Sequence, residues 1–397
     1  MAPLFRADQV GSLIRPSSLL DARKDLGVYS DELDEAQLAA TTTAIAQAVQ
    51  KQLDLSIRPI TSGEYERTGF FSGFFEKLQG MQANHHFAIP GDFRTELPTT
   101  QHLAKFGVKE FAAVAATGKI KHVTSAYLSG WNMLQQVVPP EHWKDCKITM
   151  PSITWQHLQL AEGRAYSTSA YQSGREYLAD LALAFRQEVG ILYDAGLRSI
   201  QVDDPHLTYF VLDKFKDGLR HDGVDPDELL DLYIWAHNEA IKDLPADLHV
   251  GVHLCRGNMP GTKGFLDGSY EIIAERILTR LNFNTFYLEF DDARSGSFDC
   301  LRYLPQGKSV VLGLVSTKIA ELEDAKVLES RIHEAAGAIA ASQGRSADQV
   351  LADSLAISPQ CGFASFNANR GVATEERMWE KLTLVRDVAR KIWDDAV

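Results

Sequence analysis

The stretch Ser309-Val310-Val311-Leu312-Gly313-Leu314-Val315 is almost continuously apolar. A strand with one face in water alternates apolar and polar residues, whereas a parallel strand covered on both faces need not. Residues 248–253 and 283–289 form similar short apolar runs. We therefore interpret these three segments as parallel strands in the interior of an α/β domain.

Helical patterns lie between these runs. One helix is predicted to follow Asp225, which is a suitable N-cap, with Pro226 in the first turn and Glu228 three residues after the cap. In residues 172–195, apolar side chains recur at spacings of three and four, as on one face of a helix. The same reasoning predicts further helices at residues 31–54, 270–281, 321–342 and 374–393.

Eight strands alternate with these helices. We predict them at residues 5–10, 58–62, 147–154, 198–202, 248–253, 283–289, 309–315 and 355–358. Eight such units without a Gly-x-Gly-x-x-Gly turn favour a closed (β/α)8 (TIM) barrel over a doubly wound sheet. We expect residues 1–397 to form one domain, with an elaborated insertion at about residues 68–145 in which residues 122–127 could add a strand.

The composition is that of a globular enzyme, with 45% hydrophobic and 23% charged residues. The net charge of −13 argues against nucleic acid or an anionic membrane as the partner. We find no apolar run of membrane-spanning length, and residues 1–8 are too polar for a secretory signal. Four cysteines do not make a disulfide framework, so we expect a cytoplasmic protein in which Cys146 and Cys300 are structural.

Metal-binding side chains follow the ends of the later strands. In Gly251-Val252-His253-Leu254-Cys255-Arg256-Gly257-Asn258, the imidazole and the thiol lie two residues apart, on one face of a strand. Glu289 and Cys361 end two later strands. Because the carboxyl ends of barrel strands converge on one face, these four side chains predict a tetrahedral zinc site.

The ligand spacing indicates a catalytic rather than a structural zinc site. Structural sites are usually closed knuckles of nearby cysteines, whereas these ligands come from three different strands. A thiol that binds zinc loses its proton and becomes a nucleophile at neutral pH. The same face is predicted to carry Ser12, Glu64 and Asp203.

These segments resemble, in order, those of the cobalamin-independent methionine synthase family, in particular its catalytic C-terminal barrel and its short single-barrel members. Only one of that enzyme's two barrels is covered. The segments that carry the resemblance are Val10-Gly11-Ser12, Ser62-Gly63-Glu64-Tyr65-Glu66-Arg67, Ile200-Gln201-Val202-Asp203-Asp204-Pro205, His253-Leu254-Cys255, Glu289 and Pro359-Gln360-Cys361-Gly362.

The resemblance implies zinc-dependent methyl transfer to homocysteine, giving methionine, with a methylfolate or another activated methyl compound as donor. Zn²⁺ would be held by His253, Cys255, Glu289 and Cys361. Glu64 and Asp203 would bind the amino group of the substrate, and Ser12 its carboxylate. The partners would thus be a small thiol and a methyl donor, and a homo-oligomer is compatible with this assignment.

The sequence departs from the family at the donor side. The family has a histidine in an Asp-Ile-His-Ser segment that helps to protonate the folate leaving group, whereas Val315 stands at the matching position here. No residue is therefore assigned as the general acid. The family's folate-stacking tryptophan has no clear counterpart in this sequence either, although Trp155 lies near.

Three other functions stay open. Alkyl transfer to another thiol, as in epoxyalkane–coenzyme M transferases, would favour Lys or Arg where Glu64 and Asp203 stand. A decarboxylating lyase on the related uroporphyrinogen decarboxylase scaffold would leave the zinc ligands unexplained. A non-catalytic zinc or thiol sensor would need the ligands but no second substrate.

Overall fold

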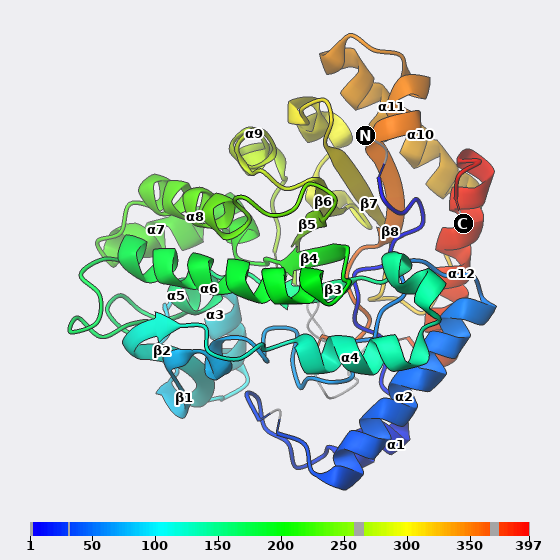
Figure 1. The fold of residues 1–397 in the computed structure, drawn as a ribbon. Helices are drawn as coiled ribbons and strands as arrows, with labels where there is room; N and C mark the ends of the chain where they lie inside the picture. The colour runs from blue at the N-terminus through cyan, green and yellow to red at the C-terminus, as the bar shows by residue number, and fades with distance from the viewer. Residues whose placement is uncertain (1–2, 31, 258–265, 366–372, 397) are drawn as a thin grey trace.

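The structure is a computed structural model that describes residues 3–30, 32–257, 266–365 and 373–396. Its centre is a parallel sheet that confirms the predicted α/β class (Figure 1). In spatial order the strands are β3 (Ile148–Pro151), β4 (Ser199–Asp203), β5 (His249–Leu254), β6 (Thr285–Glu289), β7 (Ser309–Val315) and β8 (Leu355–Pro359). Every residue of β4, β6, β7 and β8 is buried, as the continuous apolar runs predict.

The first two predicted strands are isolated bridges rather than strands of a ladder. Ala7 pairs with Ile357 of β8, and Ile60 pairs with Cys146 just before β3. In the first segment the Gln9 N–H donates to the Asp8 side chain, which competes with ladder formation. In the second segment Pro59 has no N–H to donate.

The two bridged segments also contact each other, because the Leu13 N–H donates to the Gly63 carbonyl over 3.1 Å. Backbone hydrogen bonds thus connect β8, the N-terminal segment, the segment around residue 60 and β3 in turn. Six of the eight predicted barrel strands therefore form a continuous ladder, and the other two are segments attached by single bridges.

Helices surround the sheet (Figure 1). They are α1 (Ser17–Ala22), α2 (Glu35–Asp54), α3 (Pro98–Lys105), α4 (Leu128–Val137), α5 (Trp155–Gln159), α6 (Gly174–Asp194), α7 (Asp213–His221), α8 (Pro226–Ala240), α9 (Glu271–Arg280), α10 (Ala325–Gln343), α11 (Ala347–Ser354) and α12 (Glu375–Ile392). The predicted cap of α8 is confirmed, since the Asp225 carboxylate accepts hydrogen bonds from the N–H groups of Asp227 and Glu228. Asp31, the predicted start of α2, and Asn258 lie outside the described residues.

The insertion is more regular than its sequence suggests. It contains the antiparallel strands β1 (Gln79–Ala88) and β2 (Glu110–Lys121), together with α3 and α4. The predicted strand at residues 122–127 is wrong. Its Ala126 and Tyr127 N–H groups donate to the buried carboxylate of Glu188 in α6, so they are not available to a neighbouring strand.

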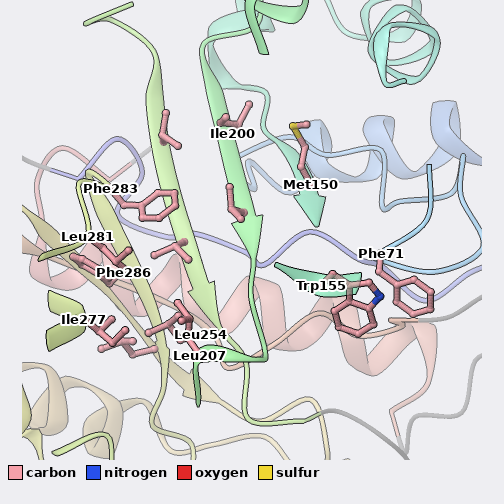
Figure 2. Close-up of a cluster of buried hydrophobic side chains, with 14 of the residues drawn as sticks. Phe71, Met150, Trp155, Ile200, Leu207, Leu254, Ile277, Leu281, Phe283 and Phe286 are labelled. Atoms are coloured by element: carbon pink, nitrogen blue, oxygen red, sulfur yellow. The ribbon is translucent and has the colours of Figure 1, made fainter. Parts of the chain in front are cut away.

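The core fills the space between the sheet and its helices. Figure 2 shows Leu254 and Phe286, from β5 and β6, close to Ile277 of α9. All three side chains are at most 1% exposed, and each contributes about 1.5–3 kcal/mol by burial. None of the described helices is long and apolar enough to cross a membrane.

Candidate functional site

The fold gathers the four predicted metal ligands. One ligand atom from each of His253, Cys255, Glu289 and Cys361 lies within 4.8 Å of the other three. His253 belongs to β5 and Cys255 follows that strand, while Glu289 ends β6 and Cys361 follows β8. The strand ends thus bring together residues that are far apart in the chain.

A glycine permits the close approach of β7 to the segment that carries Cys361. A Cβ atom on Gly313 of β7 would lie 2.7 Å from the Cα of Gln360 and 3.0 Å from the Leu288 carbonyl oxygen. These backbone atoms cannot move aside easily, so a larger side chain at Gly313 would displace the loop that holds Cys361.

The imidazole of His253 is buried, and neither ring nitrogen forms a hydrogen bond within the described chain. Its Nε2 lies 3.8 Å from Glu289 Oε1, which is beyond hydrogen-bond distance. Burial, with a smaller effect of Lys147, lowers the pKa of His253 to about 3. A neutral imidazole without hydrogen bonds is costly to bury, and it has the form that binds a metal ion.

The two cysteines face each other as free thiols. Their sulfur atoms lie 3.6 Å apart, and neither forms a disulfide. The contact with Cys361 and burial both raise the pKa of Cys255. The protein alone therefore keeps this thiol protonated, and a cation at the site would favour the thiolate.

Glu289 is held between two groups. Its Oε1 accepts a hydrogen bond of 2.9 Å from the Arg256 N–H, and its Oε2 lies 3.3 Å from the Lys318 ammonium. Burial alone would lower the pKa of Lys318, but Glu289 and Asp291 outweigh it and the pKa is raised. Sequence analysis missed Lys318, although it closely follows the end of β7.

One nitrogen, two sulfurs and one carboxylate oxygen suit zinc. The unpartnered His253 ring and the two adjacent thiols fit a metal ion better than they fit an apolar core.

The second group of predicted residues comes from the end of β4 and from the turns that follow the two bridged segments. Glu64 has a positive φ of 61°, and its Oε1 accepts a hydrogen bond from the Thr149 hydroxyl (2.6 Å) and forms an ion pair with Arg67 (2.8 Å). Its Oε2 is buried without a partner among the described residues. Asp203, at the end of β4, pairs in register with His253.

The two carboxyl groups act on each other. Burial, followed by repulsion from Glu64, raises the pKa of Asp203 to about 8. Buried carboxylates that repel each other are stabilised by a cation between them. A cation between Glu64 and Asp203 would therefore reduce the repulsion between them.

Ser12 adjoins the loop that follows β8. A Cβ on Gly362 would lie 1.9 Å from the Ser12 hydroxyl oxygen, so a side chain larger than that of glycine would clash there. The hydroxyl also accepts a long hydrogen bond of 3.4 Å from the Ala364 N–H. Ser12 is thus next to the segment that contains Cys361.

His206 is a buried residue of this region that sequence analysis missed. Its ring stacks on Trp155, with the centroids 4.5 Å apart and the planes at 5°, and Phe71 stacks on Trp155 at 4.7 Å. Neither His206 nitrogen has a hydrogen-bond partner in the described structure, and burial lowers its pKa to about 4. Its position, three residues after Asp203, was the available signal.

Hydrogen bonds to Asp204 hold the turn that carries His206. The Asp204 carboxylate accepts hydrogen bonds from the N–H groups of His206 and Leu207, and it lies 2.7 Å from His237 Nε2. Burial, the largest single cause, would raise the pKa of Asp204, but the hydrogen bond and charge of His237, with smaller effects of His206 and Ser152, together outweigh burial and lower the pKa.

Comparison with known proteins gives consistent matches. The family model described as "Cobalamin-independent synthase, Catalytic domain" matches residues 164–391. The uncharacterised protein YxjH of Bacillus subtilis is 32% identical over 391 residues, which cover 98% of this chain and 95% of YxjH. The 5-methyltetrahydropteroyltriglutamate–homocysteine methyltransferase of Bacillus licheniformis is 23% identical, and the match covers 95% of this chain but 42% of that protein.

Solved structures match over almost the whole chain. The putative vitamin-B12-independent methionine synthase of Listeria monocytogenes has a TM-score of 0.68 and 28% identity, covering 99% of both chains. A B12-independent methionine synthase from Shewanella, in complex with selenomethionine, shares the fold with a TM-score of 0.69, 18% identity and 98% coverage of both chains. On these matches, the chain belongs to the cobalamin-independent methionine synthase family, through its catalytic domain.

Proposed function

We propose that this protein transfers a methyl group to the thiol of homocysteine and so forms methionine. The observation that carries the proposal is the cluster of His253, Cys255, Glu289 and Cys361, whose ligand atoms lie within 4.8 Å of one another. These residues would hold one zinc ion. When bound, zinc lowers the pKa of a coordinated thiol, so that the substrate is a thiolate at neutral pH.

The chain's own residues would orient the rest of the substrate. The unpartnered Glu64 Oε2 and the Asp203 carboxylate would accept hydrogen bonds from the ammonium group. Ser12, beside Gly362, would donate to the substrate carboxylate. In the transfer, a bond forms between sulfur and the methyl carbon, and the electron pair of the broken bond stays with the donor.

The donor must be activated by a group other than a histidine in β7, because Val315 is a fully buried aliphatic residue. A tertiary amine leaves poorly unless it is protonated. The proposal therefore includes methylfolates, methylcobalamin and S-methyl sulfonium compounds as donors to be compared. A reducing cytoplasm would keep Cys255 and Cys361 available as thiols.

The test is a donor screen with zinc-loaded protein and homocysteine. The donors are mono- and polyglutamyl methylfolate, methylcobalamin and an S-methyl sulfonium compound, and methionine is the product measured. We expect methionine from at least one donor with the wild type and none with Cys361→Ser. If no donor yields methionine, the methyltransferase proposal is wrong.

Substrate binding is measured separately from turnover. Calorimetry in two buffers of different ionisation heat should detect homocysteine binding with proton release. 2-Mercaptoethanesulfonate, a thiol without an ammonium group, should bind more weakly because Glu64 and Asp203 repel its sulfonate. Tighter binding of the sulfonate would instead favour alkyl transfer to that class of thiol.

A further inference from the structure

A series of buried hydrogen bonds connects Lys147, Gln201 and Asp203. It begins at Lys147, just before β3, whose side chain is fully buried. The Lys147 ammonium donates to Asp8 Oδ1 (2.6 Å), to the Gln9 carbonyl (2.5 Å) and to Gln201 Oε1 (2.7 Å). A lysine has three N–H donors, so all of them are used.

Gln201 of β4 is the next residue in this series. Its Nε2 donates to the Val10 carbonyl over 2.8 Å and to Asp203 Oδ1 over 2.7 Å. The orientation of an amide must be inferred from its neighbours, and here two neighbours agree. Lys147 can only donate and the Val10 carbonyl can only accept, so the NH₂ group must face Asp203.

This arrangement gives the two oxygens of Asp203 different environments. Oδ1 is held by Gln201, whereas Oδ2 has no hydrogen bond from any described residue. Glu64 shows the same division, with Oε1 held by Arg67 and Thr149 and Oε2 unpartnered. Each carboxylate therefore keeps one oxygen for a ligand.

We propose that Gln201, fixed by Lys147, is a positioning residue that sets the rotation of the Asp203 carboxylate so that its Oδ2 receives the ammonium group of the amino-acid substrate. This inference rests on the proposed function, since it specifies how the amino group is bound. Gln201 itself does not contact the substrate. It acts through Asp203, and Lys147 acts through Gln201.

The experiment compares two thiols that differ only in the amino group. Homocysteine carries the ammonium, and 4-mercaptobutanoate is the same molecule without it. The test variant is Gln201→Met, which keeps the side-chain length but removes the amide. The matched control is Gln156→Met, because Gln156 is also fully buried and bonded through its amide, to Tyr29 and the Val114 N–H.

A positioning role predicts a selective effect. In zinc-loaded Gln201→Met, the Kd for homocysteine should rise roughly tenfold to a hundredfold, as expected for the loss of a hydrogen bond to a charged group. The Kd for 4-mercaptobutanoate and the zinc content should match those of the wild type. Gln156→Met should show the wild-type ratio of the two Kd values. An equal rise for both thiols, or no rise for either, would overturn the proposal.

Lys147 provides a second test. Lys147→Met removes one of the two neighbours that orient the Gln201 amide, so it should weaken homocysteine binding in the same selective way. If Lys147 acts through Gln201, the double variant Lys147→Met/Gln201→Met should lose no more than Gln201→Met alone. Fully additive losses would show that the two residues act independently, against the proposal.

A crystal structure of Gln201→Met separates this inference from the proposed function. The Asp203 carboxylate should be rotated relative to the wild type, and an unchanged carboxylate would refute positioning whatever the substrate is. If instead the wild type binds both thiols equally, the ammonium site of the proposed function is wrong, while the structure still decides whether Gln201 orients Asp203.

Discussion

The sulfur atoms of Cys255 and Cys361 lie 3.6 Å apart, although 106 residues separate them in the sequence. Strands β5 and β8 are not neighbours in the sheet, since β6 and β7 lie between them. The two thiols therefore meet across the carboxyl end of the sheet, next to the unpartnered ring of His253. Packing alone does not explain why two thiols meet here, because small apolar side chains would fill the same space equally well.

Removal of one of these thiols should release the metal. We expect about one zinc atom per chain in the purified wild type and a loss of zinc affinity of more than about a hundredfold in Cys361→Ser, since even loss of an outer partner of a ligand costs 10–100-fold. Cys300→Ser is the control, because Cys300 is equally buried but lies outside the cluster. Elemental analysis measures the zinc content, and competition with a chelator measures the zinc affinity. Full zinc content in Cys361→Ser would rule out this residue as a ligand.

Buried histidines make the fold sensitive to acid, and His157 and His206 are two examples. Burial lowers the pKa of His157 to about 3 and that of His206 to about 4, whereas an unfolded histidine titrates near 6.5. Below pH 6.5 the unfolded chain binds protons that the folded chain does not, so stability falls as the pH falls towards 4. At pH 5 the loss should be roughly 2 kcal/mol for each histidine.

His157→Gln tests this pH dependence. The difference in the free energy of unfolding between pH 7 and pH 5, measured by denaturant titration, should shrink by about 2 kcal/mol relative to the wild type. A pH difference equal to that of the wild type would mean that His157 is not the group responsible.

The strand ends illustrate how much of this site the sequence predicts. Continuous apolar runs identify β5 to β8, because buried parallel strands need no polar face. Once these strands are placed, the positions of His253, Cys255 and Glu289 follow from the convergence of strand ends. These candidate ligands can therefore be predicted from the sequence, because strand direction and register determine where they lie.

Other features depend on contacts that the sequence does not reveal. The segments around Asp8 and Pro59 have apolar residues suited to strands, but a local side-chain hydrogen bond and a missing N–H prevent ladders. Lys318 and His206 lie in loops, where the direction of a side chain depends on tertiary packing. The antiparallel strands β1 and β2 are separated in the chain by α3, and no short periodic pattern in the insertion indicates such a long-range pairing.

The unpartnered nitrogens of His206 should cost stability. His206→Phe keeps an aromatic ring against Trp155 and removes both buried polar atoms, so we expect it to stabilise the protein by about 1–2 kcal/mol at pH 7. His206→Ala, which also removes the stacked ring, should be destabilising. Thermal unfolding at fixed protein concentration compares the three proteins. A His206→Phe variant less stable than the wild type would indicate that the nitrogens are satisfied in solution.

Glu188 should hold the insertion to α6. Its buried carboxylate interacts with four groups, namely His122 Nε2, the Ser125 hydroxyl and the N–H groups of Ala126 and Tyr127, all within 2.9 Å. Glu188→Gln replaces one acceptor oxygen by an NH₂ group that faces these donors, and we expect a loss of about 3 kcal/mol.

Hydrogen exchange locates this effect. The amides of Ala126 and Tyr127 should exchange faster in Glu188→Gln, whereas Glu176→Gln, at an exposed position of the same helix, should leave them unchanged. Unaltered protection of both amides in Glu188→Gln would show that the carboxylate does not anchor this segment.

The isolated bridges at Ala7 and Ile60 connect one side of the site to the sheet by fewer backbone hydrogen bonds than the other side has. Ser12 and Glu64 follow the segments attached through Ala7 and Ile60, whereas Asp203, His253 and Glu289 lie on fully laddered strands. A bound amino acid that contacts both sets would therefore connect the two segments that have few backbone hydrogen bonds to the laddered strands. Part of its binding free energy would be used to order those two segments. The free and the substrate-bound protein would therefore differ most in the region between β8 and β3.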